Sequence, residues 1–190
     1  MLLLVGLGNP GSSYTNTRHN IGFKIIDAIN AHFKLSKQKP KFKGLLTTGN
    51  IDEKKIYAIK PLTFMNNSGT AIKELIDYFK IEAKDVIVFH DDMDIDFGKI
   101  KAKFGGSSAG HNGIESIDKF IGKDYSRVRI GIGHPKQKKK VNNHVLEDFK
   151  EDEDEKIKEI TENIVKQIPT LIDKKIDLFS SKVNQNLNGI

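Results

Sequence analysis

The chain has 190 residues, no cysteine and a formal net charge of +6 at pH 7, and its length fits about one domain. The absence of cysteine excludes disulfides and thiolate metal sites. No apolar stretch approaches the roughly 20 residues that a membrane-spanning helix needs, and no signal peptide is visible, so we expect a cytoplasmic protein without membrane contact.

The amino-terminal half alternates apolar runs, typical of strands, with helical spacing of apolar residues. Val86–Phe89 is continuously apolar, which is typical of a strand buried on both faces. A hairpin is expected across Asn50–Glu53, and Pro61 is expected to end its second strand. In chain order the expected elements are a strand at residues 2–5, a helix at 21–33, strands at 42–48 and 55–60, a helix at 68–79 and a strand at 85–89.

In the carboxyl-terminal half, residues 99–104 alternate Lys with Ile, Ala and Phe, which predicts a half-buried strand with a basic outer face. The Gly- and Ser-rich residues 105–110 are expected to form a mobile loop. Pro169 is expected to start a second short helix that reaches Phe179, and residues 180–190 are expected to be a frayed polar tail. The other expected elements are a helix from Asn112 to Ile121, a strand at 127–132, a basic loop at 136–140 and a helix at 151–167.

Strands that alternate with helices predict a single α/β sheet, which the expected hairpin makes mixed. No repeat or long linker divides the chain, so residues 1–190 are interpreted as one domain. Six short loops carry Gly together with Asn, Asp or His, and at least three follow an expected strand. Since open α/β sheets bind ligands at the carboxyl ends of their strands, these loops are candidates for a polar active site. They lie at residues 6–11, 18–20, 63–66, 90–92, 110–113 and 131–135.

Gly6–Gly11 matches the dinucleotide-binding pattern G-x-G-x-x-G and follows an expected strand. That pattern needs a helix directly after its second glycine and an acid at the tip of the next strand. Here the helix starts near Asn20, and Asp27 lies inside it. The interpretation of the chain as a nucleotide-cofactor oxidoreductase therefore rests on this loop alone.

Metal binding and nucleophilic catalysis have weak support. The six His residues form no His-x-x-x-His pair, although His90 beside Asp91 and Asp92 could hold a cation. The chain has no cysteine nucleophile, and its G-x-S-x-G pattern, at residues 106–110, lies in the expected mobile loop and not in a strand-to-helix elbow. General-base hydrolysis suits the loops best, because a His oriented by a carboxylate can activate water while Asn side chains fix the substrate and stabilise an oxyanion. His19 considered alone would more often be structural.

The charge distribution favours a polyanionic partner. Residues 141–190 carry 7 Lys against 11 Asp and Glu, which leaves +10 on residues 1–140. Lys99, Lys101 and Lys103 share one face of an expected strand, where they form a basic stripe suited to phosphate. A lysine-rich solvated surface would give the same counts, so charge alone leaves both interpretations open.

Six ordered motifs run along the chain. They are G-L-G-N-P-G at residues 6–11, R-H-N-x-G at 18–22, K-P-x-T-[FY]-M-N-x-S-G at 60–69, D-[DE]-x-D at 91–94, G-G-x-x-x-G-H-N-G at 105–113 and R-[IV]-G-I-G-[HR]-P at 129–135. From about Leu3 to Phe149 the chain resembles the bacterial-type peptidyl-tRNA hydrolases, and several motifs at family spacing are far more specific than any one of them. The resemblance implies a monomeric single-domain hydrolase with a twisted mixed sheet, parallel at its centre, and helices on both faces.

The resemblance also implies the reaction and the residues that perform it. The substrate would be an N-blocked aminoacyl chain esterified to tRNA, held at its acceptor stem and CCA end and hydrolysed without a covalent intermediate, metal or cofactor. His19 matches the general base and Asp91 the carboxylate that orients it. Asn9 matches the residue that recognises the blocked end. The other matches are substrate contacts at Tyr14, Phe64, Met65, Asn66 and Asn112 and a phosphate-binding pair at Lys103 and Arg129.

A second interpretation is a non-catalytic relative that keeps the fold and binds RNA. The complete set of His19, Asp91 and the Asn residues speaks against it, because RNA binding alone does not require that set. His90, His111 and His134 compete with His19 for the role of base, and we assign them supporting or structural roles.

Overall fold

Seven strands build one mixed sheet in a computed structural model that describes residues 1–135 and 141–187. They are β1 (Leu2–Gly6), β2 (Lys39–Lys41), β3 (Gly44–Ile51), β4 (Lys54–Pro61), β5 (Val86–Asp92), β6 (Ile100–Phe104) and β7 (Ser126–Gly131). Their order across the sheet is β2-β3-β4-β1-β5-β7-β6. Parallel pairing joins β4, β1, β5 and β7, while β6 at one edge and β3 and β2 at the other pair antiparallel.

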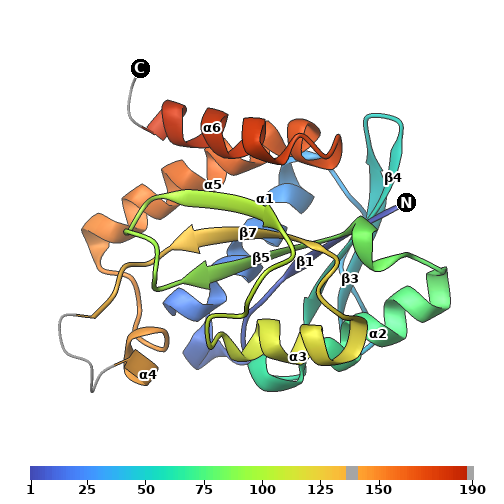
Figure 1. Ribbon diagram of the computed structural model, residues 1–190, viewed down its shortest axis with the longest axis horizontal. Helices are drawn as coiled ribbons and strands as arrows, with labels where there is room; N and C mark the ends of the chain where they lie inside the picture. The colour runs from blue at the N-terminus through green and yellow to red at the C-terminus, as the bar shows by residue number, and fades with distance from the viewer. Residues whose placement is uncertain (136–140, 188–190) are drawn as a thin grey trace.

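Helices cover both faces of this sheet (Figure 1). On one side lie α1 (Ile21–His32), α5 (Glu151–Ile172) and α6 (Ile176–Leu187), and on the other lie α2 (Ser68–Phe79) and α3 (Asn112–Ile121). The short α4 (Val141–His144) lies beside the carboxyl ends of β5 and β7. Among the described residues no helix is both long and apolar enough to cross a membrane. The predicted α/β fold with a parallel centre is confirmed; the basic loop expected at 136–140 lies outside the described residues.

The central strands are apolar throughout because successive side chains point to opposite faces and both faces are covered. Leu4 and Phe89 pack with α1, α5 and α6, whereas Val5 and Val88 pack with α2 and α3. Each such side chain contributes about 1.5–3 kcal/mol when it is fully buried. Two apolar layers therefore hold the central strands, and their carboxyl ends, in fixed positions.

Strand β5 is longer than the sequence indicated. Residues 90–92 were expected to form a loop, but the pairing of β5 with β7 continues as far as Asp92 opposite Gly131. Its pairing with β1 ends at Phe89. His90, Asp91 and Asp92 therefore stand on a rigid strand beyond the end of β1.

The hairpin is confirmed, with β3 and β4 joined by Asp52 and Glu53. The edge strand β2 was not predicted, because its three residues are all exposed and include Pro40, so no apolar pattern marks it.

The prediction that Pro169 starts a separate helix is wrong, because Pro169 lies inside α5. A proline in a helix interior costs about 3 kcal/mol. The surrounding residues Val165, Ile168, Leu171 and Ile172 are all buried, and their combined burial exceeds that cost. The helix therefore continues through the proline to Ile172.

The prediction of a frayed tail from Ser180 is also wrong for the described residues, since α6 extends to Leu187. Val183 is fully buried. The polar residues of α6 serve the sheet edge: Ser180 Oγ accepts a hydrogen bond from Ala102 N at 2.8 Å, and Asn184 Oδ1 accepts one from Ile100 N at 3.0 Å. Helix α6 thus covers the free edge of β6, which would otherwise present unpaired backbone groups.

Candidate active site

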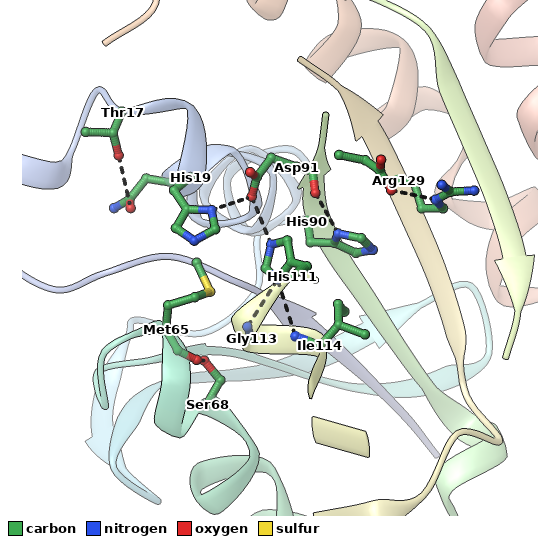
Figure 2. A network of polar contacts seen from close by, with 12 residues as sticks. Thr17, His19, Met65, Ser68, His90, Asp91, His111, Gly113, Ile114 and Arg129 are labelled. Carbon is green, nitrogen blue, oxygen red and sulfur yellow. Dashed lines mark hydrogen bonds and ion pairs between the residues drawn. The ribbon is translucent and has the colours of Figure 1, made fainter. Parts of the chain in front are cut away.

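A buried histidine–carboxylate pair lies at the carboxyl end of β5 (Figure 2). His19 lies in a short 3-10 helix, Arg18–Asn20, that leads directly into α1. Its Nδ1 donates a hydrogen bond to Asp91 Oδ1 at 2.8 Å, and the two residues are 7% and 1% exposed. Because an ionised carboxylate only accepts hydrogen bonds, Nδ1 carries the proton of the neutral ring and Nε2 keeps its lone pair. The structure therefore brings the two predicted catalytic residues into direct contact.

A second histidine bonds the same carboxylate oxygen. His111 Nε2 donates to Asp91 Oδ1 at 3.0 Å, while His111 Nδ1 accepts from the backbone N–H groups of Gly113 and Ile114 at 3.1 and 3.3 Å. His111 is thereby the N-cap of α3. The sequence marked it only as a supporting residue. One sequence feature could have predicted its role as N-cap. His111 directly precedes an expected helix, where a side chain that accepts backbone hydrogen bonds is favoured.

The pair shifts both ionisation equilibria. Burial raises the pKa of Asp91, but the two adjacent histidines and their hydrogen bonds outweigh burial and hold that pKa well below its ordinary value of 3.8. Burial lowers the pKa of His19, yet the charge of Asp91 and its hydrogen bond more than offset this, so the pKa rises above 6.5. The arrangement therefore combines an ionised carboxylate with a strengthened imidazole base.

His90 is 1% exposed and plays no direct part in this pair. Its Nδ1 donates to the backbone oxygen of Asp91 at 2.8 Å, and its ring lies edge-on to His111 with 4.8 Å between centroids. Burial and the neighbouring His111 lower the pKa of His90 well below 6.5, so its ring is neutral. His134 is exposed.

Among the described residues, His19, Asp91 and His111 also form a group whose possible ligand atoms lie close enough together, within 4.8 Å, to be considered as a metal site. The two histidine nitrogens lie 2.8 and 3.0 Å from one Asp91 oxygen. Ligands of a tetrahedral zinc ion at ordinary bond lengths lie about 3.3 Å from one another. These distances fit hydrogen bonds better than shared coordination. The cation site considered at residues 90–92 is disfavoured because the Asp92 carboxylate binds Arg129.

One cavity joins the base to most of the predicted substrate contacts. Its lining residues are Asn9, His19, Phe64, Met65, Asn66, Asn112, Val145 and Leu146. Asn9 Oδ1 accepts a hydrogen bond from Met65 N at 2.8 Å, which leaves the Asn9 Nδ2 group as a donor. Tyr14 stands beside Phe64, with 6.4 Å between ring centroids in an edge-on arrangement. The cavity therefore has amide groups and one aromatic ring, that of Phe64, along its lining, with Tyr14 beside that ring.

Phe64 is held in an unfavourable backbone conformation. Its φ is 51° and its ψ is 157°, a region that residues with side chains rarely adopt, and 53% of the residue is exposed. Such strain costs about 1–3 kcal/mol and concentrates at functional sites. An exposed aromatic ring on a strained backbone is well suited to contact a ligand.

A segment from the carboxyl-terminal part of the chain forms one wall of the site, and sequence reasoning missed it. His19 N donates to Val145 O at 2.8 Å, and Arg18 N donates to Glu147 O at 3.0 Å. The buried Arg18 side chain donates to Asp148 O at 2.9 Å and pairs with Glu153 at 2.7 Å. Arg18 therefore fixes this segment and the start of α5 against His19.

Lys103 and Arg129 lie apart from the cavity, on a face of β6 and β7. Lys103 stands opposite Arg127 and Lys101 opposite Arg129, so four cations share this face, which we call the basic face. Burial and the charges of Arg127 and Arg129 lower the pKa of Lys103. Arg127 is occupied structurally, since its Nη2 donates to Gly105 O at 2.9 Å.

An α/β sheet with a buried histidine–carboxylate pair at the carboxyl ends of its strands, beside a basic face, has the groups that a general-base hydrolase of a polyanionic substrate needs. The family model for peptidyl-tRNA hydrolase matches residues 3–189, and the chain belongs to this family. The predicted family is therefore confirmed, and the interpretation as a nucleotide-cofactor oxidoreductase is wrong.

Relatives support the assignment over nearly the whole chain. A peptidyl-tRNA hydrolase of Pelagibacter ubique is 73% identical over 184 residues, which cover 97% of this chain and 99% of the relative. One of Ehrlichia ruminantium is 46% identical over 181 residues, covering 95% and 93%. The crystal structure of a peptidyl-tRNA hydrolase from Acinetobacter baumannii is similar with a TM-score of 0.91 at 34% identity, covering 97% of this chain and 94% of that one.

Proposed function

We propose that this protein hydrolyses the ester bond between tRNA and the peptide of peptidyl-tRNA that has dropped from ribosomes, and so recycles the tRNA. Membership of the peptidyl-tRNA hydrolase family supports the activity. The observation that carries the mechanism is the hydrogen bond of His19 Nδ1 to buried Asp91, which leaves Nε2 free in a cavity that His19 lines.

The reaction follows from that geometry. His19 Nε2 takes a proton from a water molecule as the water oxygen attacks the ester carbonyl carbon, and Asp91 stabilises the imidazolium that forms. The carbonyl oxygen becomes an oxyanion, for which amide donors such as the Asn112 side chain are available in the cavity. When the tetrahedral intermediate collapses, the bond to the ribose oxygen breaks and that oxygen takes the proton from His19. An ester needs no stronger nucleophile than such a water.

Asn9 is assigned to the blocked end of the substrate. Because its Oδ1 is engaged by Met65 N, its Nδ2 can donate to the carbonyl oxygen of the first peptide group. A free α-amino group, with a reference pKa of about 8, is mostly protonated at pH 7. Its N–H groups can only donate hydrogen bonds, so they cannot accept one from Asn9 Nδ2. Met65, Asn66 and the rings of Tyr14 and Phe64 are assigned to the peptide and the terminal adenosine.

Lys103 and Arg129 are assigned to tRNA phosphate, supported by the +10 charge of residues 1–140. Binding at the acceptor stem and CCA end, action as a monomer without metal or cofactor, and a cytoplasmic location belong to the same proposal.

The direct test is incubation with N-acetyl-aminoacyl-tRNA and, in parallel, with unblocked aminoacyl-tRNA, scoring release of the ester. We expect rapid hydrolysis of the blocked substrate only. Equal hydrolysis of both would contradict the role of Asn9. Tight tRNA binding with no hydrolysis of either would favour the non-catalytic RNA-binding interpretation instead.

A further inference from the structure

Asp92 follows Asp91 in β5 and lines a pocket together with His19 and Asp91, but its carboxylate bonds Arg129 of the basic face. It is 9% exposed, and both of its oxygens are engaged. Oδ2 accepts a hydrogen bond from Arg129 Nε at 2.7 Å, and Oδ1 accepts one from Asp94 N at 2.9 Å. The contact with Arg129 is drawn at the right of Figure 2. A carboxylate thus stands in direct contact with a cation of the basic face.

The orientation of this contact matters. Because Asp92 uses the Nε of Arg129, the two terminal guanidinium nitrogens are not consumed by the pair, and between the described residues they form no hydrogen bond. Arg129 lines a groove between β6 and α6 together with Lys101 and Lys103. A guanidinium held at Nε presents its remaining N–H groups as a fork, which matches the oxygens of a phosphate group.

The surrounding charges give Asp92 a second effect. Lys103, Arg127 and Arg129 repel one another across β6 and β7, and the Asp92 carboxylate counteracts this repulsion at Lys103. Without Asp92, Arg129 would be free to rotate away from its cationic neighbours. The side chain of Arg129 is long and rotamer-rich, so ordering it before a ligand arrives reduces the entropy lost on binding.

We propose that Asp92 is a positioning residue for phosphate binding: it holds Arg129 through Nε so that the outer guanidinium nitrogens and Lys103 Nζ converge on one backbone phosphate of the nucleic-acid substrate. This inference rests on the proposed function. It sets Asp92 apart from Asp91, its neighbour in sequence, which serves the base.

The test is Asp92→Asn, assayed on full-length N-acetyl-aminoacyl-tRNA and on a blocked amino acid esterified to adenosine, which has no tRNA body. Simple electrostatics predicts tighter tRNA binding, because a negative charge is removed next to a polyanion site. The proposal predicts the opposite sign. KM for the full-length substrate should rise by about tenfold, the equivalent of one charge-assisted hydrogen bond, with kcat and the short substrate unchanged.

Further variants serve as controls. Asp96→Asn removes the same charge from an exposed side chain four residues away, and it should leave KM unchanged or slightly lower. Asp92→Glu keeps the carboxylate and should restore part of the affinity. Combined with Arg129→Ala, Asp92→Asn should add little to the loss that Arg129→Ala causes alone. Thermal unfolding of each variant checks that it is folded.

A lower KM in Asp92→Asn, matching Asp96→Asn, would overturn the proposal. An equal loss on the short and full-length substrates would also overturn it, because it would assign Asp92 to the turn at Asp94 N. If the unchanged chain hydrolyses neither substrate, the proposed function fails separately. The role of Asp92 is then tested by the Kd for deacylated tRNA. The proposal predicts a higher Kd in Asp92→Asn, and simple electrostatics predicts a lower one.

Discussion

The proposed catalytic cavity and the basic face differ in how their charged groups are paired. Beside the cavity one buried carboxylate, Asp91, accepts hydrogen bonds from two histidines through a single oxygen, so its partners are supplied within the protein. On the basic face, Lys101, Lys103, Arg127 and Arg129 share a surface on which Asp92 is the carboxylate in hydrogen-bond contact with Arg129. The hydrogen-bond partners of Asp91 are thus already in place, whereas the basic face gains from an added anion.

Under the proposed function, the cavity determines the rate of the chemical step and the basic face determines the affinity for tRNA. Like charges that face each other across strands destabilise a sheet by a few tenths of a kcal/mol or more, so the pairing of Lys103 with Arg127 has a cost that folding alone does not explain. Changes in the cavity should therefore lower kcat on every substrate. Changes on the basic face should raise KM only for substrates that carry the tRNA body.

The largest effect in the cavity is expected from His19→Ala. Loss of the base should reduce kcat by about 10²–10⁴-fold on the full-length and the short substrate alike. Steady-state kinetics with both substrates measures this, and circular dichroism checks the fold. If activity survives in His19→Ala while His111→Ala abolishes it, the base is His111 and the assignment is wrong.

Asp91→Asn should cost less than His19→Ala, because it disturbs the orientation and pKa of the base without removing it. The pKa of His19 lies above 6.5 because of Asp91, and the base works only when neutral, so kcat/KM of the unchanged protein should fall as the pH drops through that raised pKa. In Asp91→Asn burial still lowers this pKa and the opposing charge is gone. The acidic limb of the pH–rate profile should therefore move to lower pH. If the acidic limb stays at the same pH, Asp91 does not raise the pKa of His19.

The role of the basic face is tested by replacing Lys103 and Arg129 with alanine. Each single alanine variant should raise KM for full-length tRNA substrates with kcat nearly intact. It should also flatten the salt dependence of binding, by about 0.7–0.9 in log–log slope for each phosphate that the variant no longer neutralises. The short substrate should be unaffected. If the double variant loses the same factor on both substrates, the pair belongs to the catalytic centre and the separation of the two regions fails.

Asn9→Asp sharpens the comparison within the cavity. An aspartate can still accept the hydrogen bond from Met65 N, so the local fold should persist. It replaces the Nδ2 donor by an oxygen, which repels a peptide carbonyl and attracts a free ammonium group. The ratio of blocked to unblocked hydrolysis should narrow in parallel assays. A uniform fall in rate at an unchanged ratio would leave Asn9 as a structural turn residue.

Local patterns in the sequence predicted most of the fold because the elements concerned are specified locally. Apolar runs and helical spacing located β1, β5, α1 and α2. Elements that depend on distant partners were missed or misplaced: β2 forms only because β3 offers it an edge, and α5 passes through Pro169 because buried residues compensate for it. The same holds for the polar residues of α6, whose partners lie in β6.

The candidate site divides in the same way. Ordered motifs marked His19 and Asp91, although 72 residues separate them, and they also marked the lining residues Asn9, Met65 and Asn112. They gave no sign that Arg18 would be buried under a distant segment or that His111 would share the Asp91 oxygen. Both features depend on tertiary contacts that no spacing within a motif encodes.

The contacts of Arg18 bear on when the site is completed. Arg18 meets backbone oxygens that lie 126 to 130 residues further along the chain. Synthesis proceeds from the amino terminus, and domains fold as their residues become available. A growing chain is itself a peptide esterified to tRNA, the bond that the finished protein is proposed to cleave. The order of translation therefore withholds one wall of the site until most of the chain has been made.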